Sequence, residues 1–339
     1  MDADPSSSPT KQTAALQDNF GRTIKYVRLS VTDKCNMRCF YCLPEGFKGF
    51  EVPDNWLTFD EIERVISAFT RLGVSRVRLT GGEPLVRKGL PELATRLSAL
   101  DNLEDLSLST NAALLTRHAK ALKNAGISRI NVSLDSLRAD RFKSITGNGK
   151  LAEVLAGLQA AKDAGLSPVK INTVAMKDVN DDEFIDLVNY CGDMGFTLRF
   201  IETMPVGDTG RNASDSYLDL QEVKKTLSQE FDLIPGFVAG GGPARYYKVR
   251  DNDLHIGFIT PISQHFCETC NRVRISVDGS LYLCLGDEHK FELRPLLRQG
   301  ISDAGLEEVI AEAIHLKPEK HVFNSNPNQV IRFMSMTGG

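Results

Sequence analysis

Residues 26–42 have the sequence YVRLSVTDKCNMRCFYC, which joins a short β-rich run to three closely spaced cysteines. The run Tyr26–Val31 has the composition of a β-strand, and Cys35, Cys39 and Cys42 follow in the loop after it. In barrels built from alternating strands and helices, chemistry is placed at the carboxyl ends of the strands. This junction therefore gives the first indication of both the fold and the site.

The same β-rich composition recurs along the chain. Five further runs lie at Val74–Thr80, Asp105–Thr110, Ile127–Leu134, Val169–Val174 and Phe196–Ile201. Between them, apolar residues recur at helical spacing, most clearly over 62–72 and 184–194, and glycines at 73, 126, 165 and 195 follow four of these stretches as helix stop signals. Six alternating strand–helix units predict a parallel sheet, either doubly wound or curved into a barrel.

One face of the predicted strands is unusually polar. Its side chains are those of Arg28, Ser30, Arg76, Arg78, Asn131, Ser133, Asp135, Lys170, Asn172 and Arg199. A packed barrel carries branched aliphatic residues at such positions, and burying polar groups is costly unless something pairs with them. Any one of them could lie in water at a strand end, but the whole set predicts a hollow, ligand-filled barrel.

Composition limits the class of protein. The 339 residues include 40 basic and 44 acidic side chains, a formal net charge of −4, with 42% hydrophobic and 25% charged residues. This composition is that of a globular protein, and its mild acidity argues against a dedicated binder of nucleic acids or anionic membranes, since both need a broad basic face; local arginines must then hold any anionic ligand. The first residues show no secretory signal and no apolar run approaches a membrane span, so we expect a cytoplasmic protein with reduced cysteines.

Three regions are predicted. Residues 1–20 are rich in Ser, Asp and Pro and are expected to form a disordered tail, and residues 21–235 form the barrel. The stretch Gly236–Pro243 opens a C-terminal region, 236–339, that ends in a flexible Gly338-Gly339 tail. Its predicted strands lie at Tyr246–Val249, Leu254–Ile259, Arg272–Val277 and Leu281–Cys284, before an amphipathic helix over 306–314.

The seven cysteines fall into two triplets and one isolated residue. Three thiolates with the spacing of Cys35, Cys39 and Cys42 can hold three irons of a four-iron cluster, whereas a closed zinc site needs a fourth ligand that is missing nearby. The second triplet, Cys267, Cys270 and Cys284, fits either iron–sulfur or zinc, with His265 or His289 as a possible fourth zinc ligand. Cys191 lies on the apolar stripe of its helix and is interpreted as a small buried hydrophobe.

Two motifs together resemble those of a known superfamily. The first triplet with Tyr41 before its last cysteine, followed by Gly81-Gly82-Glu83-Pro84, resembles the radical S-adenosylmethionine (SAM) superfamily. The second triplet with Asn271-Arg272-Val273-Arg274 between its cysteines, and the terminal Gly338-Gly339, resemble the GTP 3′,8-cyclase family of molybdenum cofactor biosynthesis. The resemblance runs from about Phe20 to Gly339 and implies a partial (β/α)6 barrel whose C-terminal extension carries a second iron–sulfur cluster.

The resemblance implies the cofactors and their ligands. Cys35, Cys39 and Cys42 would hold a [4Fe–4S] cluster that binds SAM, and Cys267, Cys270 and Cys284 a second one that meets the guanine of GTP. On this resemblance the second triplet also becomes an iron–sulfur site. Tyr41, Gly82, Ser133 and Met204 match SAM-contacting positions, with Gly82 allowing close approach of the backbone to the methionine part.

The resemblance also implies a reaction. Cleavage of SAM would give a 5′-deoxyadenosyl radical that takes the C3′ hydrogen of GTP, and the carbon radical would attack guanine C8. The product would be (8S)-3′,8-cyclo-7,8-dihydroguanosine 5′-triphosphate, which a separate cyclic pyranopterin monophosphate synthase consumes. An electron donor protein and a homodimer are also expected.

Arginine forks suit a triphosphate because they bind phosphate oxygens in bidentate fashion. Positions matching GTP contacts in the family are Arg28, Arg78, Ser109, Lys170, Arg272, Val273 and Arg274. Ser109 departs from the threonine common in the family but keeps the hydroxyl. Arg28, Arg272, Arg274, Gly338 and Gly339 are the expected catalytic positions, the glycine tail helping to position the last two arginines.

Two alternatives remain open at this point. One is a radical SAM enzyme that modifies peptides and carries an auxiliary cluster; the other is a zinc-stabilised binding module without chemistry. Neither the electron donor nor a general acid for the product can be identified from the sequence.

Overall fold

The computed structural model describes residues 15–250 and 252–338. Six parallel strands form the middle of one sheet: β1 (Tyr26–Thr32), β2 (Arg76–Gly81), β3 (Asp105–Thr110), β4 (Arg129–Ser133), β5 (Val169–Val174) and β6 (Thr197–Ile201). Each matches a run predicted from the sequence. The predicted α/β architecture of six strand–helix units is thus confirmed.

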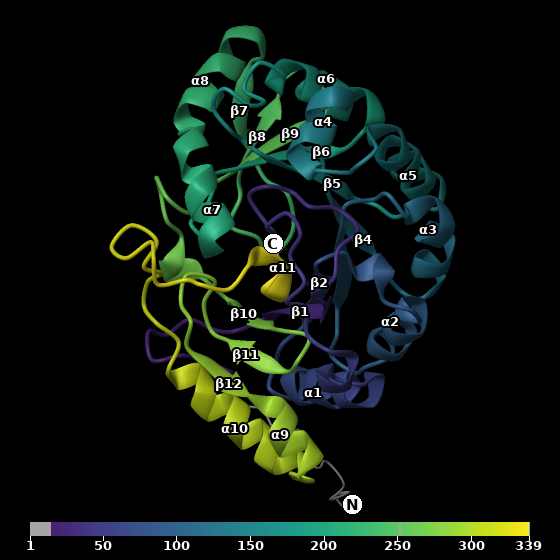
Figure 1. Ribbon diagram of the computed structural model, residues 1–339, viewed down its shortest axis with the longest axis vertical. Coiled ribbons are helices and arrows are strands. Elements are labelled where there is room, and N and C mark those ends of the chain that lie inside the picture. Colours follow the sequence, from purple (N-terminus) through teal and green to yellow (C-terminus); the bar gives the residue numbers. More distant parts are fainter. Residues whose placement is uncertain (1–14, 251, 339) are drawn as a thin grey trace, which may run out of the picture.

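Helices cover the outer face of these strands. They are α1 (Phe59–Arg71), α2 (Leu90–Ser98), α3 (Leu115–Asn124), α4 (Ala139–Thr146), α5 (Leu151–Asp163) and α6 (Phe184–Met194), and they form an arc around the sheet in Figure 1. The strand side chains that meet them are apolar and buried, as Val27, Leu29 and Val77 illustrate. The polar positions of the same strands consequently face the inside of the arc, because successive side chains of a strand alternate.

The C-terminal region extends this sheet at both edges. β9 (His255–Ile259) pairs in parallel with β6, and β8 (Arg245–Val249) and β7 (Leu233–Gly236) follow it in antiparallel pairing. On the other side, β10 (Arg272–Ile275) pairs in parallel with β1, followed by antiparallel β11 (Ser280–Tyr282) and β12 (Lys290–Glu292). The order is β12-β11-β10-β1-β2-β3-β4-β5-β6-β9-β8-β7, so β7 and β12 end an open sheet.

The remaining helices lie after α6, apart from two short 3-10 helices near the N-terminus. They are α7 (Gly207–Ala213), α8 (Leu220–Glu230), α9 (Leu293–Arg298), α10 (Asp303–His315) and α11 (Met334–Thr337), with short 3-10 helices η1 (Pro53–Asn55), η2 (Pro84–Val86), η3 (Ser214–Ser216) and η4 (Cys267–Thr269). α10 packs against α1, whereas α11 lies inside the arc against β1 and β2 (Figure 1). No helix in the described ranges is both long and apolar enough to cross a membrane.

The predicted disordered tail over 1–20 needs a correction at its end. Residues 1–14 lie outside the described residues, but 15–20 join the fold. Leu16 is buried, its amide N donates to the Leu72 carbonyl at 3.3 Å, and Asp18 forms a buried ion pair with Arg22. Polar composition hid this segment because a single apolar residue, Leu16, provides its packing.

The contact between α3 and α5 depends on a glycine. A Cβ added at Gly157 in α5 would lie 2.1 Å from the Ala112 carbonyl oxygen and 3.3 Å from the Leu115 Cβ. Gly192 in α6 is different, since the atom nearest to an added Cβ there is 3.8 Å away. Both glycines lie within helices, but only Gly192 has room for a Cβ atom.

Replacing Gly157 with Ala should lower the thermal unfolding midpoint by several degrees, because the clash with backbone costs about 2 kcal/mol and outweighs the better helix propensity of Ala. Gly192→Ala is the matched control and should leave the midpoint unchanged or raise it slightly. Calorimetry at one fixed scan rate measures both variants. A Gly157→Ala protein as stable as Gly192→Ala would show that α3 and α5 are not held this closely.

Candidate functional site

Two cavities lie inside the arc of the sheet, and the first contains the cysteine triplet that follows β1. Cys35, Cys39 and Cys42 line it together with the Gly81-Gly82-Glu83 turn after β2. The loop is held by local hydrogen bonds from the amides of Cys42 and Leu43 to the Cys39 carbonyl, at 2.9 and 3.1 Å. The two motifs that the sequence separates by some forty residues thus share one cavity.

The chemistry of these thiols fits a cationic iron centre. Burial raises the pKa of Cys35 to about 11 and that of Cys42 to about 12, and raises the pKa of Cys39 well above its usual value. Glu83 adds to the effect at Cys35, and the neighbouring cysteines add to it at Cys39 and Cys42. Three thiolates so close together repel one another unless a bound cation compensates their charge. All seven cysteines are free of disulfides, so the triplet is available as ligands.

The turn after β2 shows why glycine is required there. A Cβ at Gly82 would lie 2.3 Å from the Lys34 carbonyl oxygen, and one at Gly81, where φ is +139°, would lie 2.0 Å from the Thr32 carbonyl oxygen. The turn therefore lies directly on the start of the cysteine loop. Glycine at position 82 serves this backbone contact, in addition to the ligand approach expected from the sequence.

Glu83 anchors the same turn, a function that sequence reasoning did not assign to it. Its carboxylate accepts hydrogen bonds from the Asn111 amide at 2.7 Å, the Thr110 hydroxyl at 2.8 Å and the Leu85 amide at 3.0 Å. Burial raises the pKa of Glu83 to about 7 despite these donors. The motif itself was the only signal for this residue.

The four positions predicted to contact SAM all line the first cavity: Tyr41, Gly82, Ser133 and Met204. The Tyr41 hydroxyl donates to Asp135 at 2.6 Å, and the other oxygen of Asp135 accepts from the Val174 amide at 2.8 Å. Burial raises the pKa of Asp135 to about 6. These contacts fix the Tyr41 ring between the cysteine loop and the ends of β4 and β5.

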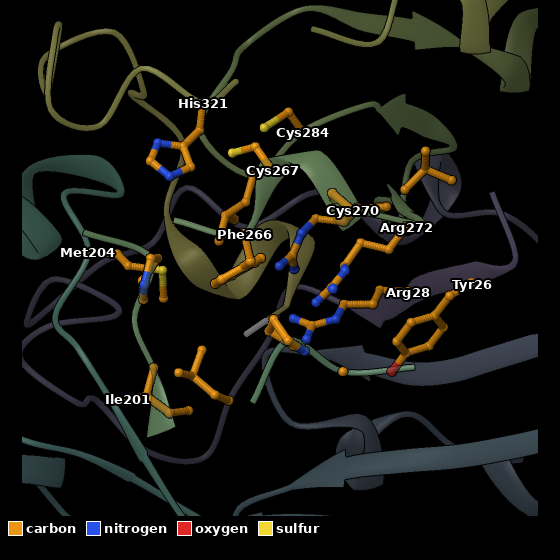
Figure 2. Close-up of a pocket in the computed structure, with 18 of the residues that line it drawn as sticks. Tyr26, Arg28, Ile201, Met204, Phe266, Cys267, Cys270, Arg272, Cys284 and His321 are labelled. Carbon is orange, nitrogen blue, oxygen red and sulfur yellow. The ribbon is translucent and has the colours of Figure 1, made fainter. Parts of the chain in front are cut away.

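The second cavity contains the other triplet (Figure 2). Cys267, Cys270 and Cys284 lie along one side of it, and Arg28 and Tyr26 lie on the opposite side. Neither histidine considered as a zinc ligand lines this cavity: His289 bonds to Asp287 at 2.6 Å, and the exposed His265 contacts the edge of the His321 ring. In the described residues no group of three His, Cys, Asp or Glu side chains is arranged to hold a single metal ion.

A buried lysine compensates charge beside this triplet. Lys317 is 2% exposed, and its Nζ donates to the carbonyls of Leu283 and Arg272. Burial raises the pKa of Cys270, but the positive charges of Lys317 and Arg272 outweigh this effect and lower the pKa below its usual value. Burial raises the pKa of Cys267 and Cys284, with Lys317 opposing it. Lys317 follows α10 and has no sequence pattern that points to the site.

Five arginines converge on the second cavity: Arg28, Arg78, Arg199, Arg272 and Arg274. Among the described residues none of the five forms an ion pair with a carboxylate, in contrast to Arg129 with Asp105 or Arg332 with Glu288. The Nε atoms of Arg28, Arg199 and Arg272 are buried and find no hydrogen-bond partner in the part of the chain that the structure describes. The fold thus leaves guanidinium donors unsatisfied at the place where the strand faces meet.

The electrostatic cost of this cluster is visible in its pKa values. Burial, reinforced by neighbouring arginines, lowers the pKa of Arg78 to about 9 and that of Arg274 well below its usual value. Burial also lowers the pKa of Arg28 and of Arg199. Burial and the nearby charge of Arg199 together lower the pKa of Lys170 to about 7. Uncompensated buried cations are unfavourable, so the cavity is built for an anionic ligand.

The C-terminal segment reaches the arginine cluster. Arg274 donates through Nη1 to the Thr337 carbonyl at 3.0 Å and also to the Gly338 carbonyl. Thr337 is fully buried, and a Cβ at Gly338, where φ is +71°, would lie 2.3 Å from the Thr80 Cγ2. Gly339 lies outside the described residues.

Three other residues predicted to contact the substrate lie in different places. Val273 is among the residues that border the second cavity, but its side chain is buried in the hydrophobic core. Ser109 lines the first cavity, and its buried hydroxyl makes no hydrogen bond within the described residues. Lys170 is 3% exposed and donates to the carbonyl of Ala239, at 3.3 Å, in the glycine-rich stretch that follows β7.

The two cavities adjoin. Asn172, Ile201 and Met204 line both, so the ends of β5 and β6 form the passage between the two triplets. Tyr26, Phe266 and His321 also line the second cavity and were missed by sequence reasoning. Tyr26 shares the polar face of β1 with Arg28, so the alternation of side chains along the strand could have indicated that Tyr26 faces the interior.

Comparisons with known proteins agree with this geometry. The family model described as Radical SAM superfamily matches residues 29–191, and the one described as Molybdenum Cofactor Synthesis C matches residues 196–323. A curated relative from Hydrogenovibrio crunogenus, named GTP 3′,8-cyclase, is 47% identical over 330 residues, covering 96% of this chain and 100% of the relative. A relative of the same name from Paracoccus denitrificans is 46% identical over 333 residues, covering 96% of each chain.

Among solved structures, the chain is similar to Streptococcus suis SuiB in its crystal structure bound to S-adenosylmethionine. The TM-score is 0.58 at 14% identity, over 85% of this chain and 68% of that one. At this identity the likeness concerns the fold.

Proposed function

The chain belongs to the GTP 3′,8-cyclase family of the radical SAM superfamily, and we propose from this membership and the site that it converts GTP into 3′,8-cyclo-7,8-dihydro-GTP. One observation carries the proposal: two adjoining cavities each contain a cysteine triplet, and five arginines without a carboxylate partner among the described residues line the second. A triphosphate ligand would supply about four negative charges to those arginines. This reaction is the first step of molybdenum cofactor biosynthesis.

The residues of the first cavity are suited to hold a [4Fe–4S] cluster with SAM. Cys35, Cys39 and Cys42 would be the cluster ligands. Their thiolates would supply the negative charge that binds iron, and the glycine turn beside them carries no side chain that would occupy the cavity. When bound, this pair of groups supplies the 5′-deoxyadenosyl radical that takes the C3′ hydrogen of the substrate. Tyr41 is oriented by Asp135 toward this ligand, and Ser133 and Met204 line the same cavity.

The residues of the second cavity would bind and orient GTP. Cys267, Cys270 and Cys284 would hold a second [4Fe–4S] cluster beside the base, with Lys317 balancing part of the thiolate charge. Arg28, Arg78, Arg272 and Arg274 can donate to phosphate oxygens without first breaking a carboxylate ion pair. Ligand binding would also keep Lys170 protonated, because a nearby anion raises the pKa that burial and Arg199 lower.

The passage between the cavities would set where the hydrogen is taken. Asn172, Ile201 and Met204 line both cavities, so a ligand in each would meet at these side chains. The carbonyls of Thr337 and Gly338 accept hydrogen bonds from the Arg274 guanidinium, so the C-terminal segment would position that arginine.

Several further features of the proposal follow from the family alone. An electron donor protein, a homodimer, a cytoplasmic location and a downstream cyclic pyranopterin monophosphate synthase stay predictions. The peptide-modifying alternative loses its support, because full-length relatives carry the cyclase name and the cationic cavity suits a nucleotide.

The proposal is tested with GTP deuterated at C3′. The reconstituted enzyme, incubated anaerobically with SAM and dithionite, should transfer deuterium into 5′-deoxyadenosine while a cyclised GTP accumulates, both followed by mass spectrometry. SAM cleavage without deuterium transfer from GTP would leave the radical SAM core intact and refute the substrate.

Replacing Gly338 with Ala should reduce turnover at least about tenfold with unchanged iron content, because the methyl group would clash with Thr80 and displace the carbonyl that holds Arg274. Gly300→Ala is the matched control, since Gly300 also has a positive φ, +82°, but an added Cβ meets nothing within 4 Å. Equal turnover of the two variants would contradict the positioning role.

A further inference from the structure

His321 is a titratable residue of the second cavity to which the proposed chemistry gives no role. It lies on the segment between α10 and α11, and Figure 2 shows its imidazole on the cysteine side of the cavity, near Cys267 and opposite Arg28. A hydrogen bond from its main chain to the Cys267 thiol ties the residue to the triplet. Phe266 adds an aromatic side chain to the same part of the cavity, and the Arg272 guanidinium lies 5.5 Å from its ring centroid.

The hydrogen bonds of His321 fix which ring nitrogen carries the proton. The Phe323 amide donates to Nδ1 at 3.3 Å, so Nδ1 is unprotonated and the hydrogen of the neutral ring lies on Nε2. The ring is held in place by contact with the Phe323 ring, whose centroid is 4.6 Å away. His321 therefore presents a fixed donor.

That donor has no hydrogen-bond partner among residues 15–250 and 252–338. Nε2 of His321 is buried and makes no hydrogen bond to any of them. The Pro261 carbonyl is near enough to favour the protonated ring but is not placed to accept a hydrogen bond from Nε2. A buried unsatisfied donor costs about 1–3 kcal/mol, and such groups are rare unless a ligand satisfies them.

We propose that His321 is a specificity-determining residue for the base of the substrate, its Nε2–H donating a hydrogen bond to an acceptor on the O6/N7 edge of guanine. This inference rests on the proposed function, which places the base beside Cys267, Cys270 and Cys284. Guanine presents two acceptors on that edge, O6 and N7, whereas adenine presents an amino donor in place of O6. Phe266 provides an apolar wall beside the same position.

The experiment compares nucleotide binding by the reconstituted enzyme under anaerobic conditions, without SAM or reductant, using equilibrium dialysis. The ligands are GTP, 7-deaza-GTP, which lacks N7, and 2-aminopurine riboside triphosphate, which lacks O6. Wild-type enzyme should bind GTP about five- to tenfold more tightly than one of the two analogues, the value of one neutral hydrogen bond.

Two substitutions locate this preference. His321→Phe keeps the ring contact with Phe323 but removes the donor, so it should weaken GTP binding by about five- to tenfold and abolish the discrimination against that analogue. His321→Gln places an amide N–H near the position of Nε2 and should retain part of the discrimination. His315→Phe, on the exposed end of α10, is the matched control and should bind as wild type.

The outcomes separate the inference from the proposed function. Discrimination that survives in His321→Phe, or a loss of affinity equal for all three nucleotides at constant iron content, would overturn the role of His321 and leave the substrate unaffected. Failure of the wild-type enzyme to bind GTP would refute the proposed function itself.

Discussion

The parallel pairing of β1 with β10 is the constraint on which the site depends. It aligns Tyr26 with Arg272 and Arg28 with Arg274, so that alternate side chains of two distant segments face the same interior. Val27 and Val273 alternate with them and are buried in the core, which fixes the register. The first triplet follows the carboxyl end of β1, whereas Cys267 and Cys270 precede the amino end of β10. Because the strands are parallel, the two triplets lie at opposite ends of the same strands, with the arginines between them.

This arrangement buries two kinds of charged group, thiolates and guanidinium groups, and each is unfavourable in the interior without a partner. Buried thiols resist ionisation and buried arginines resist protonation, as the raised pKa of Cys35 and the lowered pKa of Arg78 show. Cationic iron centres stabilise the former and an anionic nucleotide the latter, so ligands would complete a fold that is strained electrostatically without them. Lys317 and the carbonyls of Thr337 and Gly338 are the protein's own partial compensation.

Local patterns predicted much of this from the sequence. The six parallel strands, the polar interior and the first cavity follow from short-range periodicity and from motifs such as Gly81-Gly82-Glu83-Pro84. The β1–β10 pairing could not be predicted from periodicity, because nothing local indicates which strand an edge will accept. β7 and β12 are short edge strands, and Lys317 and His321 come from an irregular segment whose placement depends on the whole C-terminal region. Ser109 stays a predicted substrate contact; it lines the first cavity, and no local pattern indicates which of the two adjoining cavities a strand residue will line.

The proposed function assigns each triplet its own iron–sulfur cluster at one end of a shared interior. Metal analysis of anaerobically reconstituted protein tests this most directly, on wild type and on two variants in which one triplet at a time is replaced by alanine. The account predicts about eight irons per wild-type chain and about four in each variant, without stoichiometric zinc. About one zinc per chain that disappears only when Cys267, Cys270 and Cys284 are replaced would contradict it.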